Sequence, residues 1–278
     1  QNNNVGILDV SDKLYALDGK TGHNKWTIPL AGSPQIGADN TIYITDNGKL
    51  SALNNQTGVK KWLSDSNASS SISIDTDGTI YSAYKKDLSA INGNDGTTVW
   101  QKKNLAPYDI QGTMVDNNNI YYYNIHSSFM AAVNKVTQNF VWQKKHTRPR
   151  GSADSDFYVI PSFGFNNEIF YSTNALDCLN GEVISRRVPP PPERIDGWLP
   201  NYSHAGRGPF STIIGPNNII YGTSSMLNAG SKFEGELMSY DDNIYKHKVL
   251  YFDKNVSMPT VPLIDDNGLI YCFSQAID

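Results

Sequence analysis

The sequence predicts an all-β fold, a single β-propeller of four-stranded blades, because two patterns repeat along the chain. The first pattern begins with Ala and ends with Trp, so that four of the five tryptophans occupy one repeat position. Its copies are Ala16–Trp26, Ala52–Trp62, Ala90–Trp100 and Ala132–Trp142. The second pattern is an Asp- or Asn-rich turn followed by an aliphatic and then an aromatic residue. Those aromatic residues are Tyr43, Tyr81, Tyr121, Phe170, Tyr221 and Tyr271.

The residue types of each repeat are typical of four short strands joined by tight turns. In the repeat that contains Trp62, the expected strands are 34–36, Thr41–Thr45, Leu50–Asn54 and Lys60–Leu63. Aromatic and branched residues alternate there with Ser and Thr, as in half-buried strands. Asp-Gly and Asn-Gly pairs favour the left-handed backbone of hairpin turns. A unit of about 40 residues cannot bury its own faces, so the copies must stack, and radial closure protects their edges.

Counting strands favours six blades, with seven as the alternative. Five repeats of four strands start near Pro34, Ser71, Tyr108, Tyr158 and Pro209. The sixth blade would be closed by pairing strands from the two ends of the chain: Lys13–Asp18, Lys25–Ile28, Thr260–Ile264 and Leu269–Phe273. The segment Val5–Leu8 has the pattern of a further inner strand, which keeps a seven-blade ring open. Either ring makes residues 1–278 one domain, because a ring sealed by both ends cannot be divided.

The first pattern resembles the tryptophan-docking repeat of pyrroloquinoline-quinone (PQQ)-like propellers, Ala-x-Asp/Asn-x-x-Thr-Gly-x-x-x-Trp. The segments that end at Trp26 and Trp62 match it fully, whereas Asp95 replaces the Thr of one copy and Gln138 the Gly of another. The family includes quinoprotein alcohol dehydrogenases and outer-membrane assembly lipoproteins, and this chain resembles the non-catalytic branch. The resemblance implies structural roles for Trp26, Trp62, Trp100, Trp142, Gly22, Gly58 and Gly96.

No cofactor or metal ion is expected. The alcohol-dehydrogenase branch carries an adjacent cysteine pair, whereas Cys178 and Cys272 are far apart in this sequence. The five histidines are scattered without a paired ligand spacing, which argues against zinc. The Asp-rich turns lack the spaced ligands of a calcium loop.

Composition limits the partners and the compartment. A net charge of −4 argues against nucleic acid as a partner, and no apolar run is long enough for a membrane-spanning helix. The chain begins with Gln1 and is rich in Asn, Ser, Thr and Tyr, which favours a secreted, periplasmic or cell-surface protein. We expect a monomer.

Two insertions hold the candidate binding residues, because propellers present function on loops that the strands hold in place. The longer one is the Pro-rich loop 186–209, and the second spans residues 143–156. Their aromatic and basic residues suit sugar rings, apolar side chains or carboxylates. The candidates are Trp198, Tyr202, His204, Arg207, Arg148 and Arg150.

The sequence therefore favours a non-catalytic, exported propeller that binds a protein or glycan partner, an anionic one among them, through loops on one face. The alternative is an enzyme. A polysaccharide lyase or hydrolase would act at the 186–209 loop, with Tyr or His as base beside Arg. A PQQ-dependent oxidoreductase is the less favoured form of that alternative.

Overall fold

The computed structural model describes strands and the turns between them, with no helix in the part of the chain that it describes. That part comprises residues 4–9, 13–18, 21, 23–30, 32, 34–68, 71–124, 127–146, 161–163, 167–171, 174–186, 211–214, 220–227, 233–240, 248–251, 263–264 and 270–271. Within it, no helix is long and apolar enough to cross a membrane. The chain divides into two compact units, Gln1–Lys145 and His146–Asp278.

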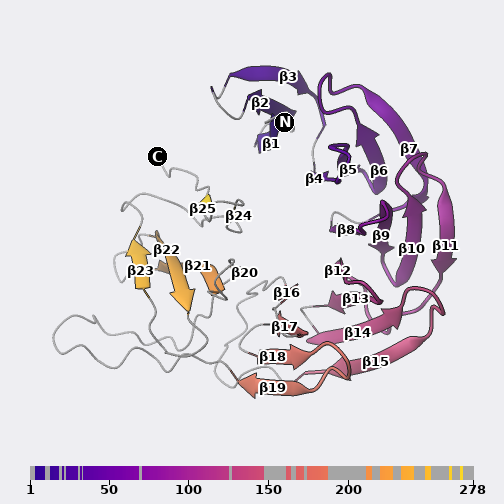
Figure 1. Ribbon diagram of the computed structural model, residues 1–278, viewed down its shortest axis with the longest axis vertical. Coiled ribbons are helices and arrows are strands. Elements are labelled where there is room, and N and C mark those ends of the chain that lie inside the picture. Colours follow the sequence, from indigo (N-terminus) through magenta and orange to yellow (C-terminus); the bar gives the residue numbers. More distant parts are fainter. Residues whose placement is uncertain are drawn as a thin grey trace. The chain divides into compact units, whose positions relative to one another are not determined.

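The described strands of the first unit form four antiparallel sheets, each built from strands that are consecutive in sequence (Figure 1). Sheet 1 consists of β1 (Asn4–Asp9), β2 (Lys13–Asp18) and β3 (Asn24–Ile28). Sheet 2 consists of β4 (Gln35–Ile36), β5 (Ile42–Asp46), β6 (Lys49–Leu53) and β7 (Lys60–Asn67). Sheet 3 consists of β8 (Ile72–Ile74), β9 (Thr79–Tyr84), β10 (Asp87–Asn92) and β11 (Thr98–Lys102). Sheet 4 consists of β12 (Gly112–Val115), β13 (Asn119–Asn124), β14 (Phe129–Asn134) and β15 (Phe140–Lys145).

The described strands of the second unit form three further antiparallel sheets. Sheet 5 consists of β16 (Ser162–Phe163), β17 (Glu168–Tyr171), β18 (Asn174–Asp177) and β19 (Val183–Arg186). Sheet 6 consists of β20 (Ser211–Ile214), β21 (Ile220–Leu227), β22 (Phe233–Tyr240) and β23 (Lys248–Tyr251). Sheet 7 consists of β24 (Leu263–Ile264) and β25 (Ile270–Tyr271).

The prediction of an all-β chain made of four-stranded antiparallel sheets is confirmed. The number of blades and the closure of the ring stay predictions. Among the described strands, β24 and β25 pair only with each other, and β1 pairs with β2 as the first strand of sheet 1. The segment Val5–Leu8 is thus part of a strand, as its pattern indicated.

The two sequence patterns meet in one row of paired residues that crosses each of the first five sheets. The rows are Gly6–Ala16–Trp26, Tyr43–Ala52–Trp62, Tyr81–Ala90–Trp100, Tyr121–Ala132–Trp142 and Phe170–Ala175–Ser185. In sheets 2 to 4 the central alanine has only a methyl group, so the flanking Tyr and Trp rings approach each other across it. Their centroids lie 5.8 to 6.1 Å apart with tilted planes, an arrangement that aromatic pairs favour.

A β-bulge follows this row in each of the five sheets, because the pairing register shifts directly after the alanine. The last strand of each sheet therefore carries one extra residue immediately before the Trp position. These residues are Lys25, Lys61, Val99, Val141 and Ile184. A bulge bends its strand and increases the local twist, so every repeat inherits the same bend at the same place.

The core of the first unit lies between neighbouring sheets. Leu14 of sheet 1 packs with Ile42, Ile44 and Leu53 of sheet 2, and Trp26 covers this cluster. The joints between sheets 2 and 3 and between sheets 3 and 4 have equivalent clusters, which include Trp62 and Trp100. Each sheet thus obtains its buried apolar area from its neighbours, as in other repeat proteins.

A tryptophan contacts the hairpin of the next sheet at two of these joints. The indole N–H of Trp26 donates to the carbonyl of Asn55, and that of Trp62 donates to the carbonyl of Gly93, both at 3.0 Å. Each ring also lies against a glycine with positive φ, Gly58 in the first case and Gly96 in the second. A Cβ atom at Gly96 would lie 2.5 Å from the Trp62 ring, so the hairpin leaves no space for a side chain.

We predict that Gly96→Ala destabilises the protein far more than Gly78→Ala. Both glycines have similar φ angles, 78° and 86°, but a Cβ atom at Gly78 meets no atom within 4 Å. The control variant should lose about 1 to 2 kcal/mol through backbone strain alone, whereas overpacking against Trp62 adds about 1 to 3 kcal/mol. Urea unfolding of the two variants measures the difference. Equal losses would mean that the Trp62–Gly96 contact does not limit stability.

Candidate functional site

Antiparallel pairing gives every four-stranded sheet two different ends. The hairpin end carries the turn between the first two strands and the hairpin between the last two. The connection end carries the central turn and the chain that leads to the next sheet. Backbone hydrogen bonds join the two segments at each end, as from Lys135 to Asn118 at the hairpin end of sheet 4. Those from Ala68 to Gly48 and from Ala106 to Lys86 do the same at the connection ends of sheets 2 and 3.

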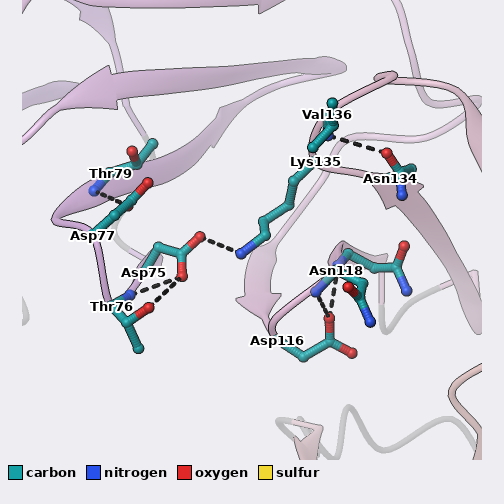
Figure 2. A network of polar contacts seen from close by, with 10 residues as sticks. Asp75, Thr76, Asp77, Thr79, Asp116, Asn118, Asn134, Lys135 and Val136 are labelled. Atoms are coloured by element: carbon teal, nitrogen blue, oxygen red, sulfur yellow. Dashed lines mark hydrogen bonds and ion pairs between the residues drawn. The ribbon is translucent and has the colours of Figure 1, made fainter.

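The carboxylates and amides at the hairpin end are occupied in holding the turns. Asp39, Asp77 and Asp116 each accept a backbone N–H two residues further on, at 2.8 to 2.9 Å. Asn54, Asn92 and Asn134 accept N–H groups of their own hairpins in the same manner. Figure 2 shows this arrangement around Asp77, Asp116 and Asn134. These side chains are turn-forming groups, the role that Asp and Asn take in such sequences.

An ion pair joins the hairpin ends of sheets 3 and 4. The Lys135 Nζ atom lies 2.6 Å from an Asp75 carboxylate oxygen, and the two side chains are 16% and 6% exposed (Figure 2). Asp75 and Lys135 occupy the places that Gly37 and Gly93 hold in the preceding repeats, as the turn hydrogen bonds indicate. At the same joint Gln138, with φ of 57°, replaces the hairpin glycine, and Lys102 Nζ donates to its carbonyl. This joint therefore has charged side chains in addition to the apolar cluster against which Trp100 packs.

The connection end of sheet 3 carries a longer loop, residues 103–111, that is tied down at both ends. The Asn104 N–H donates to the Asp87 carboxylate at 2.8 Å, and the Ile110 N–H donates to the Lys85 carbonyl at 2.6 Å. Leu105, Ala106 and Ile110 pack into the cluster between sheets 3 and 4. The remaining loop residues, Pro107 to Asp109, are exposed.

Tyr108 is the aromatic residue that this loop presents. Its ring lies edge-on to Phe129 with centroids 6.0 Å apart, and the residue remains 39% exposed. The repeat predicted to start near Tyr108 supplies its four strands, and the first of them, β12, begins at Gly112. Before β12, the loop completes its hydrogen bonds with the turn of sheet 3. The signal in the sequence was the Pro107–Tyr108 pair after a polar run.

Three exposed lysines surround the base of this loop. Lys85 and Lys86 form the central turn of sheet 3, and Lys103 begins the loop. Among the described residues these three form no ion pair, and Lys85 Nζ lies 5.7 Å from the Tyr84 ring centroid. The connection end of sheet 3 thus combines an exposed phenol ring, a proline and three lysines on a fixed backbone, with the carboxylates of Asp87 and Asp109 in the same turn and loop. Such a surface can bind carboxylates and pack against apolar or sugar rings.

The binding residues predicted from the sequence lie outside the described residues. These are Arg148, Arg150, Trp198, Tyr202, His204 and Arg207. The strands that precede them are described: β15 ends at Lys145, and β19 ends at Arg186. Each of these strands ends at the connection end of its own sheet, the end at which sheet 3 carries Tyr108. Of the repeat glycines, Gly22 also lies outside the described residues.

Four buried tyrosines of the described part are not prepared to act as bases. Burial raises the pKa of Tyr81 to about 12, with a further contribution from the charges of Asp75 and Asp77. Burial also raises the pKa values of Tyr43, Tyr122 and Tyr123. All four hydroxyls are protonated at neutral pH, whereas a general base must be deprotonated. The described residues contain no group of three His, Cys, Asp or Glu side chains that could hold a metal ion.

Residues 1–169 match the family model described as outer membrane protein assembly factor BamB. A search of curated proteins found no match.

Solved structures of several β-propeller proteins resemble the whole chain. BamB from Moraxella catarrhalis is 13% identical, with 99% of this chain and 82% of that chain covered and a TM-score of 0.56. Quinohemoprotein alcohol dehydrogenase from Comamonas testosteroni is also 13% identical, with 94% and 61% covered and a TM-score of 0.58. The computationally designed Ika8 protein is 9% identical, with 99% and 94% covered and a TM-score of 0.63. At such low identities the likenesses show the β-propeller fold alone.

We predict that Lys135→Met costs about 3 kcal/mol or more, because it leaves the buried Asp75 carboxylate without its cation. The double variant Asp75→Asn, Lys135→Met should recover most of that loss, since no charge then remains buried. Unfolding of both variants in urea measures the coupling. If the single and double variants are equally unstable, the ion pair does not hold sheets 3 and 4 together.

A second prediction concerns acid stability. A hydrogen bond from the Thr98 hydroxyl lowers the pKa of Asp65, and this bond joins β7 of sheet 2 to β11 of sheet 3. A carboxyl whose folded pKa is depressed stabilises the fold above its unfolded pKa, about 3.9, and loses that contribution as the pH falls through the folded value. The Asp65→Asn variant should therefore be less stable than the parent at pH 7, by under about 1 kcal/mol because the group is exposed.

The difference between Asp65→Asn and the parent should close as the pH falls below 4. Thermal melts between pH 7 and pH 2 give this profile. The matched control is Asp109→Asn, because the Asp109 carboxylate accepts no hydrogen bond among the described residues. A stability difference for Asp65→Asn that is constant across the range contradicts the assignment.

Proposed function

The chain belongs to the family described as outer membrane protein assembly factor BamB, and from that premise we propose that it is a non-catalytic, exported β-propeller that binds a protein partner through loops at the connection ends of its blades. The family match over residues 1–169 carries this proposal. The family is described as an assembly factor, and we take assembly to require binding to other proteins. The proposal includes a secreted, periplasmic or cell-surface location, which the richness of the sequence in Asn, Ser, Thr and Tyr favours.

The connection end is proposed as the binding face because the hairpin end is committed to structure. The hairpin-end carboxylates and amides hold turns, and two hairpins receive the tryptophan of a neighbouring sheet. The connection end differs from repeat to repeat in length and in composition. In the first unit it holds the exposed Tyr108 on a fixed loop, and the predicted loop 143–156 continues from β15, which ends there. In the second unit the predicted loop 186–209 continues from β19, which ends at the connection end of its own sheet.

An anionic glycan is the second candidate ligand. The exposed cations Lys85, Lys86 and Lys103 beside Tyr108 favour it, because sugar rings stack on aromatic faces and cations pair with carboxylate or sulfate groups. The arginines predicted from the sequence, Arg148, Arg150 and Arg207, would add to that charge. PQQ chemistry is not part of the proposal, because the sequence lacks the adjacent cysteine pair of the alcohol dehydrogenases.

The test compares loop variants with a stability control. The purified chain is immobilised and exposed to purified envelope proteins and to anionic polysaccharides, and affinities are measured by surface plasmon resonance. We expect Tyr108→Ala and Trp198→Ala to weaken protein binding by about tenfold or more, because aromatic residues dominate interface energetics. Neither variant should lower the melting temperature as Trp62→Ala does, since truncating a buried Trp costs about 3 to 5 kcal/mol.

Three outcomes contradict the proposal. Turnover of an oxidisable alcohol or of a polysaccharide makes the protein an enzyme. Binding that is unaffected by both loop variants moves the interface away from the connection end. A melting temperature that falls as far in Trp198→Ala as in Trp62→Ala makes Trp198 a structural residue.

A further inference from the structure

Four exposed lysines lie at the connection ends of sheets 3 and 4. Lys85 and Lys86 form the central turn of sheet 3, Lys103 directly follows β11, and Lys145 is the last residue of β15. Among the described residues none of these four lysines forms an ion pair. Because the whole chain has a net charge of −4, this positive charge is a local feature.

The repeat does not require a lysine in the central turn. The corresponding turn of sheet 2 is Asn47–Gly48, and Asn47 has nearly the same φ as Lys85, 49° against 52°. Asparagine adopts this left-handed backbone readily, whereas a lysine in it is strained. Lys85 therefore occupies a position at which the backbone favours another residue.

The charge at the connection end also changes between sheets. Three places after the tryptophan, sheet 2 has Asp65, whereas sheet 3 has Lys103 and sheet 4 has Lys145. Asp46 and Lys49, which flank the central turn of sheet 2, have opposite charges. Positive charge is therefore a property of sheets 3 and 4 and not of the repeat.

The loop 103–111 connects the central turns of these two sheets. On the side of sheet 3, the Ile110 N–H donates to the Lys85 carbonyl at 2.6 Å. On the side of sheet 4, the Asn124 amide donates to the Asp109 carbonyl. The loop is thus fixed to both sheets before any partner binds.

Tyr108 extends this surface from the loop to Lys145. The Tyr108 ring lies edge-on to Phe129, and Phe129 is the cross-strand partner of Lys145. Paired residues of an antiparallel sheet project from the same face, so Lys145 projects from the face of sheet 4 against which Tyr108 packs. We call the exposed side chains of this surface the connection-end patch: Lys85, Lys86, Lys103, Tyr108 and Lys145.

Two carboxylates lie in the same region. The Asp87 carboxylate accepts the Asn104 N–H at 2.8 Å, so it holds the loop. Asp109 is exposed next to Tyr108, and its carboxylate accepts no hydrogen bond among the described residues. Within the described part of this end, the four lysines outnumber the two carboxylates, and Asp109 opposes the binding of an anion.

The polar groups of this end favour an acidic protein segment over an anionic glycan. Sugar hydroxyls are bound by carboxylate and amide side chains that contact two hydroxyls at once. The Asp87 carboxylate and the Asn124 amide are instead committed to the loop and to the turn of sheet 4. The lysines and the exposed Tyr108 remain, and such groups pair with carboxylates and pack against apolar side chains.

We propose that the connection-end patch binds an acidic segment of a partner protein, with carboxylates on the lysines and an apolar side chain on Tyr108. The inference rests on the proposed function, because it takes the connection end as the binding face and a protein as the ligand. The fixed loop reduces the ordering entropy that binding costs. The lysines accelerate the encounter with a negatively charged segment.

The test removes two lysines from the patch. In the variant Lys85→Asn, Lys145→Gln, asparagine is the residue of the sheet 2 turn and glutamine keeps the length of the side chain, so the melting temperature should equal that of the parent. The matched control is Lys13→Gln, Lys60→Gln, which removes two exposed lysines from sheets 1 and 2 and changes the net charge equally. A further variant, Asp109→Asn, removes the opposing carboxylate.

The probe is a phage-displayed library of short peptides selected on the parent chain. Fluorescence anisotropy then measures the affinity of one selected synthetic peptide, with polygalacturonate and anionic phospholipid vesicles as competing probes. The selected peptides should be rich in Asp and Glu and contain an apolar residue. The patch variant should bind the peptide about tenfold more weakly, and the control should bind it like the parent. Asp109→Asn should bind it up to about fivefold more tightly, and added salt should weaken binding.

Selection of peptides without acidic residues overturns the proposal, and so does a selection that yields no peptide bound at the patch. Peptide binding that the patch variant retains, or that Asp109→Asn does not strengthen, also contradicts it. Binding of polygalacturonate or of the vesicles at these lysines, without any acidic peptide, assigns the patch to a glycan or to a membrane surface instead. The proposed function survives each of these results if Tyr108→Ala still weakens the binding of an envelope protein, so the two failures are distinguishable.

Discussion

The contact between a tryptophan of one sheet and the hairpin of the next supports the rest of the described structure. A single four-stranded sheet exposes both faces, and the described cores lie between sheets and not within them. Trp26 and Trp62 cover such a core, and each donates its indole N–H to a backbone carbonyl of the neighbouring hairpin. The contact needs a flat ring, a hairpin with no side chain beneath it and a strand bent by a bulge. The repeat supplies all three features.

The joint between sheets 3 and 4 shows how the same geometry survives a change of residues. Gln138 adopts the left-handed backbone that Gly58 and Gly96 adopt, so the hairpin keeps its shape although the glycine is gone. The Lys135–Asp75 ion pair and the bond from Lys102 to Gln138 connect the two sheets there. This joint thus combines the packing of Trp100 with an ion pair and a hydrogen bond between charged and polar groups.

A rigid repeat frees other positions for binding. The bulge residue is exposed in each of the first five sheets, so it changes from lysine to valine or isoleucine without cost to the core. At the connection end the length of the loops varies, while the arrangement of the strands that carry them stays the same. The chain belongs to the BamB family. Its strands repeat the same packing from sheet to sheet, whereas the exposed residues and loops differ.

By itself, the sequence determined the repeat, the all-β class and most strand positions, because Trp, Ala, the Asn-Gly or Thr-Gly turns and the Ile-Tyr strands act locally. It did not reveal that Tyr, Ala and Trp form one row, since that depends on register between strands that are distant in the chain. It placed the start of a repeat near Tyr108 but did not reveal the loop there, because a local pattern cannot show that the loop backbone bonds to the turn at Lys85 and Lys86. Only the tertiary structure decided which apolar residues are buried: Val133 and Val136 look alike in sequence, yet one is buried in the core and the other is exposed on a hairpin. Local sequence patterns cannot position the predicted binding residues of the two insertions, because the position of a long loop depends on the surface that it packs against.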